Sequence, residues 1–135
     1  MKNIRNIKNI KNIKITKDAT IRKALKVIEN GDIKIALVVD KEGKLIGTLT
    51  DGDIRRGFLK GRNINSSIYS IINKKPLVAK KSDRRGKLLN EGLSKKIYQI
   101  PIVNSKGKVT EIYIIDELLK SKIKLNKVVI MAGGK

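Results

Sequence analysis

The chain has 135 residues, with 32 Lys and Arg against 12 Asp and Glu, and a formal net charge of +20 at pH 7. It contains no cysteine and no histidine, which excludes disulfides, thiolate nucleophiles and imidazole bases or ligands, and we expect no metal. No apolar run approaches the roughly 18 residues of a membrane span, and the first residues given lack the apolar core of a secretion signal. We therefore expect a cytoplasmic protein without a membrane partner.

A tract of basic residues, asparagines and isoleucines opens the chain. Its isoleucines recur at a spacing of three, which drifts about 60° per repeat around an α-helix and makes no continuous apolar stripe. We therefore expect residues 1–14 to form a basic arm that packs some isoleucines against the body of the protein.

A helix is predicted between residues 21 and 30. Apolar residues recur there at helical spacing, Asp18 or Thr20 precedes them as a cap, and Gly31 follows. Such residues are typical of the two ends of a helix.

A hairpin and a second helix are expected next. Apolar runs of period two flank a tight turn at residues 41–44, which predicts two strands. A turn at Asp51 and Gly52 then leads to a helix that we expect to begin near Asp53, with Phe58 on its apolar face.

The same unit occurs twice along the chain. Residues 36–56 align without a gap with residues 100–120, an offset of 100 − 36 = 64. The second copy repeats a helix from residues 82–83, a turn at 105–108 and a helix from Asp116. Because neither half of about 60 residues buries much surface alone, we expect an α+β fold in which two small sheets pack together.

The segment at residues 47–56 carries the candidate chemistry. It ends a strand and opens a helix with hydroxyl, carboxylate and guanidinium groups. Thr50 and Asp53 are suited to a ribose, because a carboxylate accepts hydrogen bonds from vicinal hydroxyls, and Arg55 and Arg56 are suited to a phosphate. The structural alternative is that an acidic residue merely caps the helix and that the arginines are solvated.

Gly47, Thr50 and Asp53, followed by an apolar residue, match the pattern Gly-x-x-Thr-x-x-Asp. Together with the repeat, this pattern resembles a tandem pair of cystathionine β-synthase (CBS) domains. The resemblance implies subdomains at 15–65 and 66–122, each a small three-stranded sheet packed with helices, and a homodimer. In that family the Thr and Asp positions hold the ribose of an adenosine nucleotide, which implies AMP, ADP or ATP as a regulatory ligand.

An adenine ring needs an apolar slot with backbone groups at its edge. The first strand at Ile15 and Thr16, together with Ala36 and Leu37, is expected to supply this slot. Lys34 is a further candidate for a phosphate contact.

The second copy departs from the ribose signature. Ile114 stands at the position of Thr50, and Glu111 stands at the position of the signature glycine. Ile114 offers no hydrogen bond, and Glu111 would repel a phosphate if it faced the cleft, so we expect one functional site. Glu117 and Lys120 are the candidates for a weaker second site.

Residues 126–135 end in Val-Val-Ile-Met-Ala-Gly-Gly-Lys, an apolar run followed by glycines. This ending, behind a CBS pair, resembles the start of a sugar-phosphate nucleotidyltransferase of the mannose-1-phosphate guanylyltransferase type. The resemblance implies that residues 123–135 are a linker, first strand and glycine loop of a catalytic domain whose remainder lies outside this sequence. The residues given would then regulate that domain without catalysing.

Two other classes remain open. One is a structural dimerisation module with an empty cleft. The other is a basic nucleic-acid-binding protein, which the net charge favours, but the lysines are spread along the chain and aromatic residues make up only 3% of it. We therefore expect no specific nucleic-acid partner.

Overall fold

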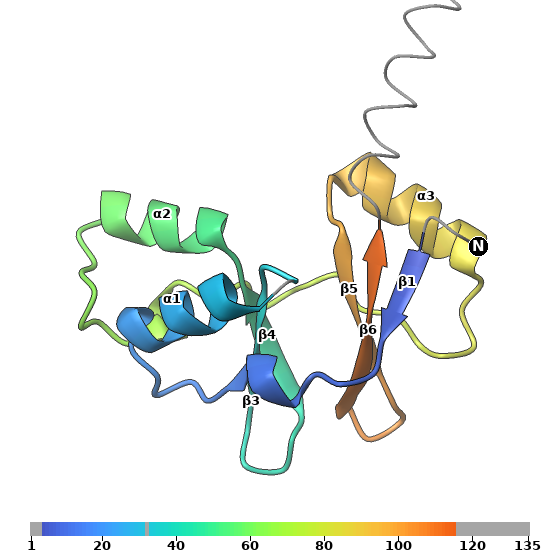
Figure 1. The fold of residues 1–135 in the computed structure, drawn as a ribbon, viewed down its shortest axis with the longest axis horizontal. Coiled ribbons are helices and arrows are strands. Elements are labelled where there is room, and N and C mark those ends of the chain that lie inside the picture. The colour runs from blue at the N-terminus through green and yellow to red at the C-terminus, as the bar shows by residue number, and fades with distance from the viewer. Residues whose placement is uncertain (1–3, 32, 116–135) are drawn as a thin grey trace, which may run out of the picture.

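The computed structural model describes residues 4–31 and 33–115 and contains two three-stranded sheets, with helices on their outer sides (Figure 1). The expected α+β fold of two small sheets packed with helices is confirmed. No helix in the part of the chain that the structure describes is long and apolar enough to cross a membrane.

The first sheet and its helices comprise β2 (Lys14–Ile15), α1 (Ile21–Asn30), β3 (Ala36–Val39), β4 (Leu45–Leu49) and α2 (Asp51–Leu59). The strand order is β2-β3-β4. Strands β2 and β3 pair in parallel, as a crossover through a helix requires, and β3 and β4 form an antiparallel hairpin. Helices α1 and α2 lie on the side away from the second sheet (Figure 1).

The second sheet and its neighbours comprise β1 (Ile4–Ile7), α3 (Arg85–Lys95), β5 (Gln99–Val103) and β6 (Val109–Ile115). Two short 3-10 turns, η1 (Lys11–Ile13) and η2 (Ile68–Ser70), lie in the connections. The strand order is β1-β6-β5 with antiparallel pairing throughout. Helix α3 covers the outer side of this sheet (Figure 1).

The N-terminal segment differs from the expected arm, because part of it is a strand of the second sheet. β1 pairs with β6 in the register Ile4↔Ile115 to Ile7↔Ile112. The isoleucines that recur at a spacing of three belong to different elements. Ile4 lies in β1, whereas Ile10 and Ile13 lie at η1 and are buried between the sheets. Residues 4–13 therefore contact both halves of the fold.

The first helix and both hairpin turns are confirmed where the sequence predicts them. Helix α2 begins at Asp51, two residues ahead of the expected start, because Thr50 in extended conformation is already its N-cap. Phe58 is not on the buried face of α2, since 43% of its surface is exposed. The helix expected from Asp116 lies outside the described residues.

Three apolar layers hold the fold together. The outer layers pack α1 and α2 against the first sheet and α3 against the second. The central layer contains Leu37 and Val39 of β3 together with Ile112 and Ile114 of β6, so the two sheets bury their inner faces against each other.

The internal repeat is visible in the details of the two hairpins. The register shifts between Val38 and Val39 in one and between Ile102 and Val103 in the other, and these places lie 102 − 38 = 64 residues apart. The hairpins also touch, since the Leu45 N–H donates to the Gly107 carbonyl at 3.0 Å.

Candidate functional site

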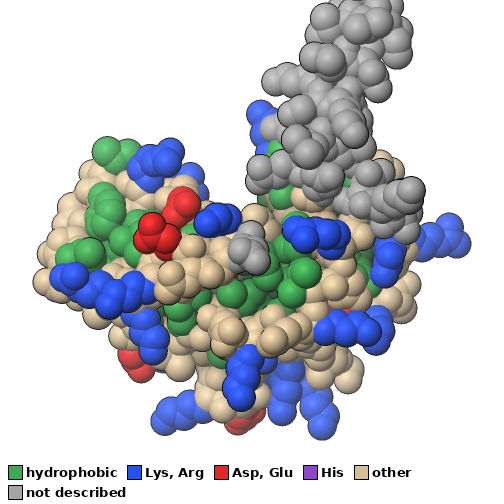
Figure 2. Space-filling view, viewed as in Figure 1, with side chains coloured by type: hydrophobic (Ala, Val, Ile, Leu, Met, Phe, Trp, Pro, Cys, Tyr) green, Lys and Arg blue, Asp and Glu red, His purple; other side chains and the backbone are tan. Residues whose placement is uncertain are grey.

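A cleft of about 380 Å³ lies where the N-terminus of α2, the connection at residues 73–77 and the C-terminal end of α3 meet. The described residues that line it are Ile35, Thr48, Thr50, Asp53, Arg56, Asn73, Pro76, Leu77, Lys95, Lys96, Ile97 and Gln99. Figure 2 shows the molecule hollowed between its two halves, with basic side chains on both flanks of the hollow. The site thus uses both subdomains.

Thr50 and Asp53 are held by a capping box at the start of α2. The Thr50 N–H and hydroxyl donate to Asp53 Oδ2 at 3.0 and 3.1 Å, and the Asp53 N–H donates to Thr50 Oγ1 at 3.5 Å. This arrangement satisfies helix-terminal donors without any ligand. It also fixes a hydroxyl and a carboxylate side by side at the wall of the cleft.

Arg56 lies one turn along the same helix and folds back toward the carboxylate. Its Nη2 donates to Asp53 Oδ1 at 2.7 Å. The Arg56 side chain is 65% exposed, whereas that of Asp53 is only 13% exposed. The guanidinium therefore covers the one oxygen of Asp53 that the capping box does not use.

Gly47 explains how the connection comes to border the cleft. A Cβ at this position would lie 2.8 Å from the Asn73 carbonyl oxygen. Because Gly47 has no Cβ, Asn73 lies close enough to β4 to pair with Thr48. The Asn73 N–H donates to the Thr48 carbonyl at 2.9 Å, and the Asn73 carbonyl accepts from the Thr48 N–H at 3.0 Å. The signature glycine therefore serves packing, and Pro76 follows at the cleft wall.

The second subdomain supplies the opposite wall. Lys95 ends α3, and Lys96 follows with φ 59° and ψ 39°, a left-handed conformation. Beyond them, Gln99 at the start of β5 donates from Nε2 to the Ile33 carbonyl at 3.1 Å. This bond links the two halves beside the cleft.

The other described residues that the sequence analysis expected at the site do not line this cleft. Arg55 is exposed and does not line the cleft, and Lys34 is exposed with a left-handed φ of 64°. Ala36 and Leu37 are fully buried in the core, so their side chains offer no adenine slot. Thr16 lines a different pocket, beside Asp40 and Tyr69. Among the expected residues that the structure describes, Thr50, Asp53 and Arg56 share one cleft and the others do not line it.

Sequence reasoning missed the apolar and basic residues that complete the cleft. Ile35, Pro76, Leu77 and Ile97 are the apolar ones, and Lys95 and Lys96 are the basic ones. Most of them come from the connection and the second subdomain, far from the signature in sequence. The repeat relates one of them, Ile97, to Ile33 at an offset of 97 − 33 = 64, but the sequence marked neither as a site residue.

A second hollow, of about 660 Å³, lies at the related position. Three residues that line it have equivalents in the first cleft at the repeat offset of 73 − 9 = 64. The equivalent pairs are Asn9 and Asn73, Asn12 and Pro76, and Ile13 and Leu77. Among the lining residues that the structure describes, Arg5, Lys23 and Lys26 are basic and none is acidic. Glu117 and Lys120, the expected weaker site, lie outside the described residues.

Comparison with known proteins bears on this geometry. The model of the CBS domain family matches residues 4–60, which include β1, the whole first sheet and the signature. Solved CBS pairs share the arrangement of both halves. The chain has the fold of a tandem CBS-domain pair.

Sequence relatives extend across most of this CBS pair. Inosine-5′-monophosphate dehydrogenase of Aquifex aeolicus is 30% identical over 112 residues, which is 80% of this chain and 22% of that enzyme. An uncharacterized protein of Helicobacter pylori strain J99 is 29% identical over 114 residues, 82% of this chain and 34% of that protein. The chain therefore spans about a fifth to a third of the length of these relatives.

Two solved structures show the fold with ligands. The CBS pair of protein MJ0100, in complex with 5′-methylthioadenosine and S-adenosyl-L-methionine, has a TM-score of 0.66 and 22% identity, covering 74% of this chain and 82% of that one. The CBS domain protein PAE2072 of Pyrobaculum aerophilum, complexed with AMP, has a TM-score of 0.64 and 16% identity, covering 72% and 75%. At these identities the likeness shows the fold.

Proposed function

We propose that the chain is a regulatory CBS pair that binds an adenosine nucleotide in the cleft between its subdomains. The observation that carries the proposal is that one cleft brings Thr50 and Asp53 together with Arg56 and with apolar and basic residues of the second subdomain. The relatives complexed with AMP and with S-adenosyl ligands support the choice of adenosine.

Each part of a nucleotide has a chemical match in the cleft. Asp53 and Thr50 suit the ribose hydroxyls, since a carboxylate accepts two hydrogen bonds and a hydroxyl both donates and accepts. Ile35, Leu77 and Ile97 give the base an apolar surface. Basic side chains at the rim suit the phosphates.

The regulatory action follows from the position of the cleft. A ligand held by α2 on one side and by the end of α3 on the other contacts both subdomains at once. It therefore favours the arrangement in which both sets of contacts are made, by as much as its affinity differs between arrangements. An attached domain that also distinguishes these arrangements would respond to the nucleotide.

Calorimetric titration of AMP, ADP and ATP into the wild type and Asp53→Asn tests the proposal. The isosteric amide keeps an acceptor for the Thr50 N–H but loses the charge. We expect binding of about one nucleotide per chain and a loss of about tenfold or more in Asp53→Asn, because hydrogen bonds to charged groups are the stronger ones. Asp51→Asn, an exposed residue in the first turn of the same helix, is the matched control and keeps the wild-type affinity.

The same titration separates the alternatives. Binding of uridine, guanosine and adenosine nucleotides alike, falling steeply with salt and unchanged in Asp53→Asn, would reduce the function to polyanion binding. Absence of binding would leave a structural module.

We also propose that the pair belongs to a cytoplasmic sugar-phosphate nucleotidyltransferase. The support is the run Val-Val-Ile-Met-Ala-Gly-Gly at residues 128–134. An assay of nucleotidyl transfer by the full-length protein, with and without adenosine nucleotide, tests this assignment. No transfer with any sugar 1-phosphate would contradict it.

Self-association has a candidate surface on α2. Phe58 and Leu59 are 43% and 83% exposed at the end of this helix, and apolar residues of this size gain free energy when a partner covers them. We propose that they contribute to a homodimer. Analytical ultracentrifugation should show a dimer that dissociates in Phe58→Glu, and a monomeric wild type would contradict the proposal.

A further inference from the structure

The charge of the cleft points to a particular class of adenosine ligand. Among the described residues that line it, Arg56, Lys95 and Lys96 are cations, and Asp53 is the single carboxylate. In the structure that carboxylate is already paired with Arg56 at 2.7 Å. The field offered to a ligand is therefore positive, and it comes from both subdomains.

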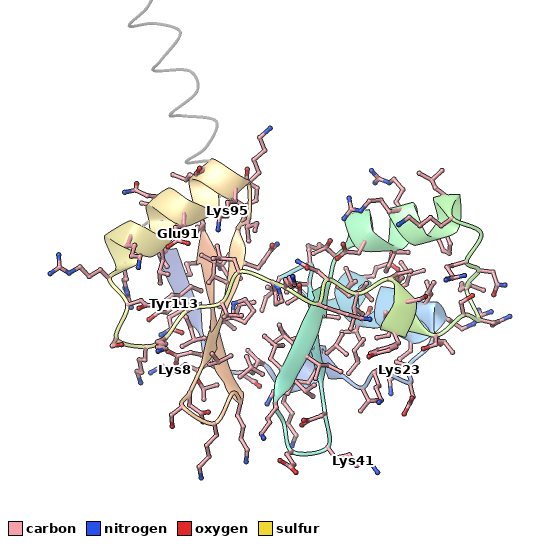
Figure 3. All side chains as sticks on the ribbon, turned by 180° about the vertical axis from the view of Figure 1, so that it is seen from behind. Lys8, Lys23, Lys41, Glu91, Lys95 and Tyr113 are labelled. Atoms are coloured by element: carbon pink, nitrogen blue, oxygen red, sulfur yellow. The ribbon has the colours of Figure 1, made fainter. Side chains whose placement is uncertain are left out.

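Lys95 and Lys96 bring this charge from the second subdomain. Lys95 Nζ lies 3.9 Å from Glu91 Oε2 on the preceding turn of α3 (Figure 3), and both side chains are partly exposed. So loose a surface pair is weak and leaves Lys95 available to a ligand.

Lys96 occupies a backbone position that normally favours glycine. Its φ of 59° is left-handed, and its N–H closes the helix by donating to the Gly92 and Leu93 carbonyls. Glycine is the usual residue at such a helix end, because it has no Cβ. The chain carries a lysine there, at the wall of the cleft.

Arg56 makes the site sensitive to the presence of a phosphate. Its guanidinium lies over the first turn of α2, where a Cβ on Gly52 would be 3.3 Å from Arg56 Nη1, and it occupies Asp53 Oδ1. A ribose hydroxyl that donates to Oδ1 competes with the guanidinium for this oxygen. A phosphate offers the displaced guanidinium a new bidentate partner, whereas a neutral or cationic group does not.

We propose that this cleft selects adenosine 5′-phosphates, with affinity rising from AMP to ATP, and rejects cationic S-adenosyl ligands. The phosphates lie between Arg56 of the first subdomain and Lys95 and Lys96 of the second. This inference rests on the proposed function, and it adds the ligand class and the residues that set it. A sulfonium ion facing three cations is repelled where a polyphosphate is attracted.

The test is a set of titrations of ATP, ADP, AMP, adenosine and S-adenosyl-L-methionine into the full chain at one low salt concentration. We expect ATP to bind about tenfold or more tightly than adenosine, as charge-assisted hydrogen bonds to phosphate predict. S-adenosyl-L-methionine should bind more weakly than adenosine.

Three variants test which residues make the cleft prefer ATP to adenosine. Lys95→Ala and Lys96→Gly should each lower ATP affinity severalfold, and more than they lower adenosine affinity. Glycine suits the left-handed position, so Lys96→Gly should unfold at the same or a higher temperature than the wild type. Arg56→Ala should change the two affinities in opposite directions, raising that for adenosine because Asp53 is freed, and lowering that for ATP. Lys87→Ala, an exposed residue of α3 outside the cleft, is the charge-matched control and should change neither.

The outcomes separate this inference from the proposed function. S-adenosyl-L-methionine binding as tightly as ATP, or equal losses for ATP in Lys87→Ala and the two cleft lysine variants, would overturn the selectivity and leave an adenosine site. No measurable binding of any adenosine ligand to the wild type would overturn the proposed function itself.

Discussion

Thr50 and Asp53 have a structural role that needs no ligand. Their capping box ties the end of β4 to the first turn of α2, and such a box is common at helix starts. The same contacts hold a hydroxyl and a carboxylate in place at the cleft wall, which lowers the ordering cost of binding. For variants at these residues, the free energy of unfolding and the nucleotide affinity must therefore be measured separately.

Thr50→Ala should lower both quantities. Loss of the cap should reduce the free energy of unfolding by about 1 kcal/mol, measured by urea denaturation, and loss of the hydroxyl should weaken nucleotide binding. Thr20→Ala is the matched control, because Thr20 caps α1 by accepting from the Lys23 N–H at 3.2 Å and does not line the cleft. It should lower stability by a similar amount and leave nucleotide affinity intact. Equal affinity losses in both variants would show that the effect of Thr50→Ala is only a loss of folding.

At the scale of an element, α3 is shaped by a close approach at Gly92. A Cβ there would lie 2.6 Å from the Ile97 carbonyl oxygen and would collide with Ile115 Cδ1. The helix therefore sits directly on the second sheet, and this closeness places its C-terminal lysines at the cleft. A Cβ on Gly86, in the first turn of the same helix, would meet no packed neighbour within 4 Å.

Alanine at these two glycines should have opposite effects. Gly92→Ala should destabilise the protein by about 1 to 3 kcal/mol through overpacking. Gly86→Ala should stabilise it by about 0.5 to 1 kcal/mol, because alanine loses less conformational entropy in a helix. Urea denaturation of both variants measures the difference. A neutral Gly92→Ala would mean that α3 can move away from β6 at little cost.

The elements that sequence predicted correctly are those with local signals. The cap at Thr20 and Gly31 bounded α1, and the glycine turns marked both hairpins. The strand at Ile4–Ile7 was not predicted, because its pairing with β6 joins residues more than a hundred positions apart. For the candidate site, the segment at residues 47–56 predicted Thr50, Asp53 and Arg56, which line one cleft. Lys96 depends on how the second subdomain packs, which no local pattern encodes.

At the scale of the whole molecule, the two copies exchange parts. β1 precedes the first copy in sequence but completes the sheet of the second, and the central apolar layer takes residues from both sheets. Neither half is therefore complete without the other. A cleft formed between them keeps its geometry only while both are folded, which couples ligand binding to the stability of the entire pair.

This exchange predicts that the pair unfolds in one cooperative transition. Ile4→Ala removes buried contacts under α3, and Ile21→Ala removes them under α1, since both side chains are at least 96% buried in opposite outer layers. Each should cost about 2 to 5 kcal/mol and shift a single urea transition seen identically by circular dichroism and tyrosine fluorescence. Val78→Ala, at a 40% exposed position outside the proposed dimer surface, is the control and should shift it little. Two separate transitions, with Ile4→Ala moving only one of them, would show that the halves fold independently and that nucleotide binding cannot stabilise both.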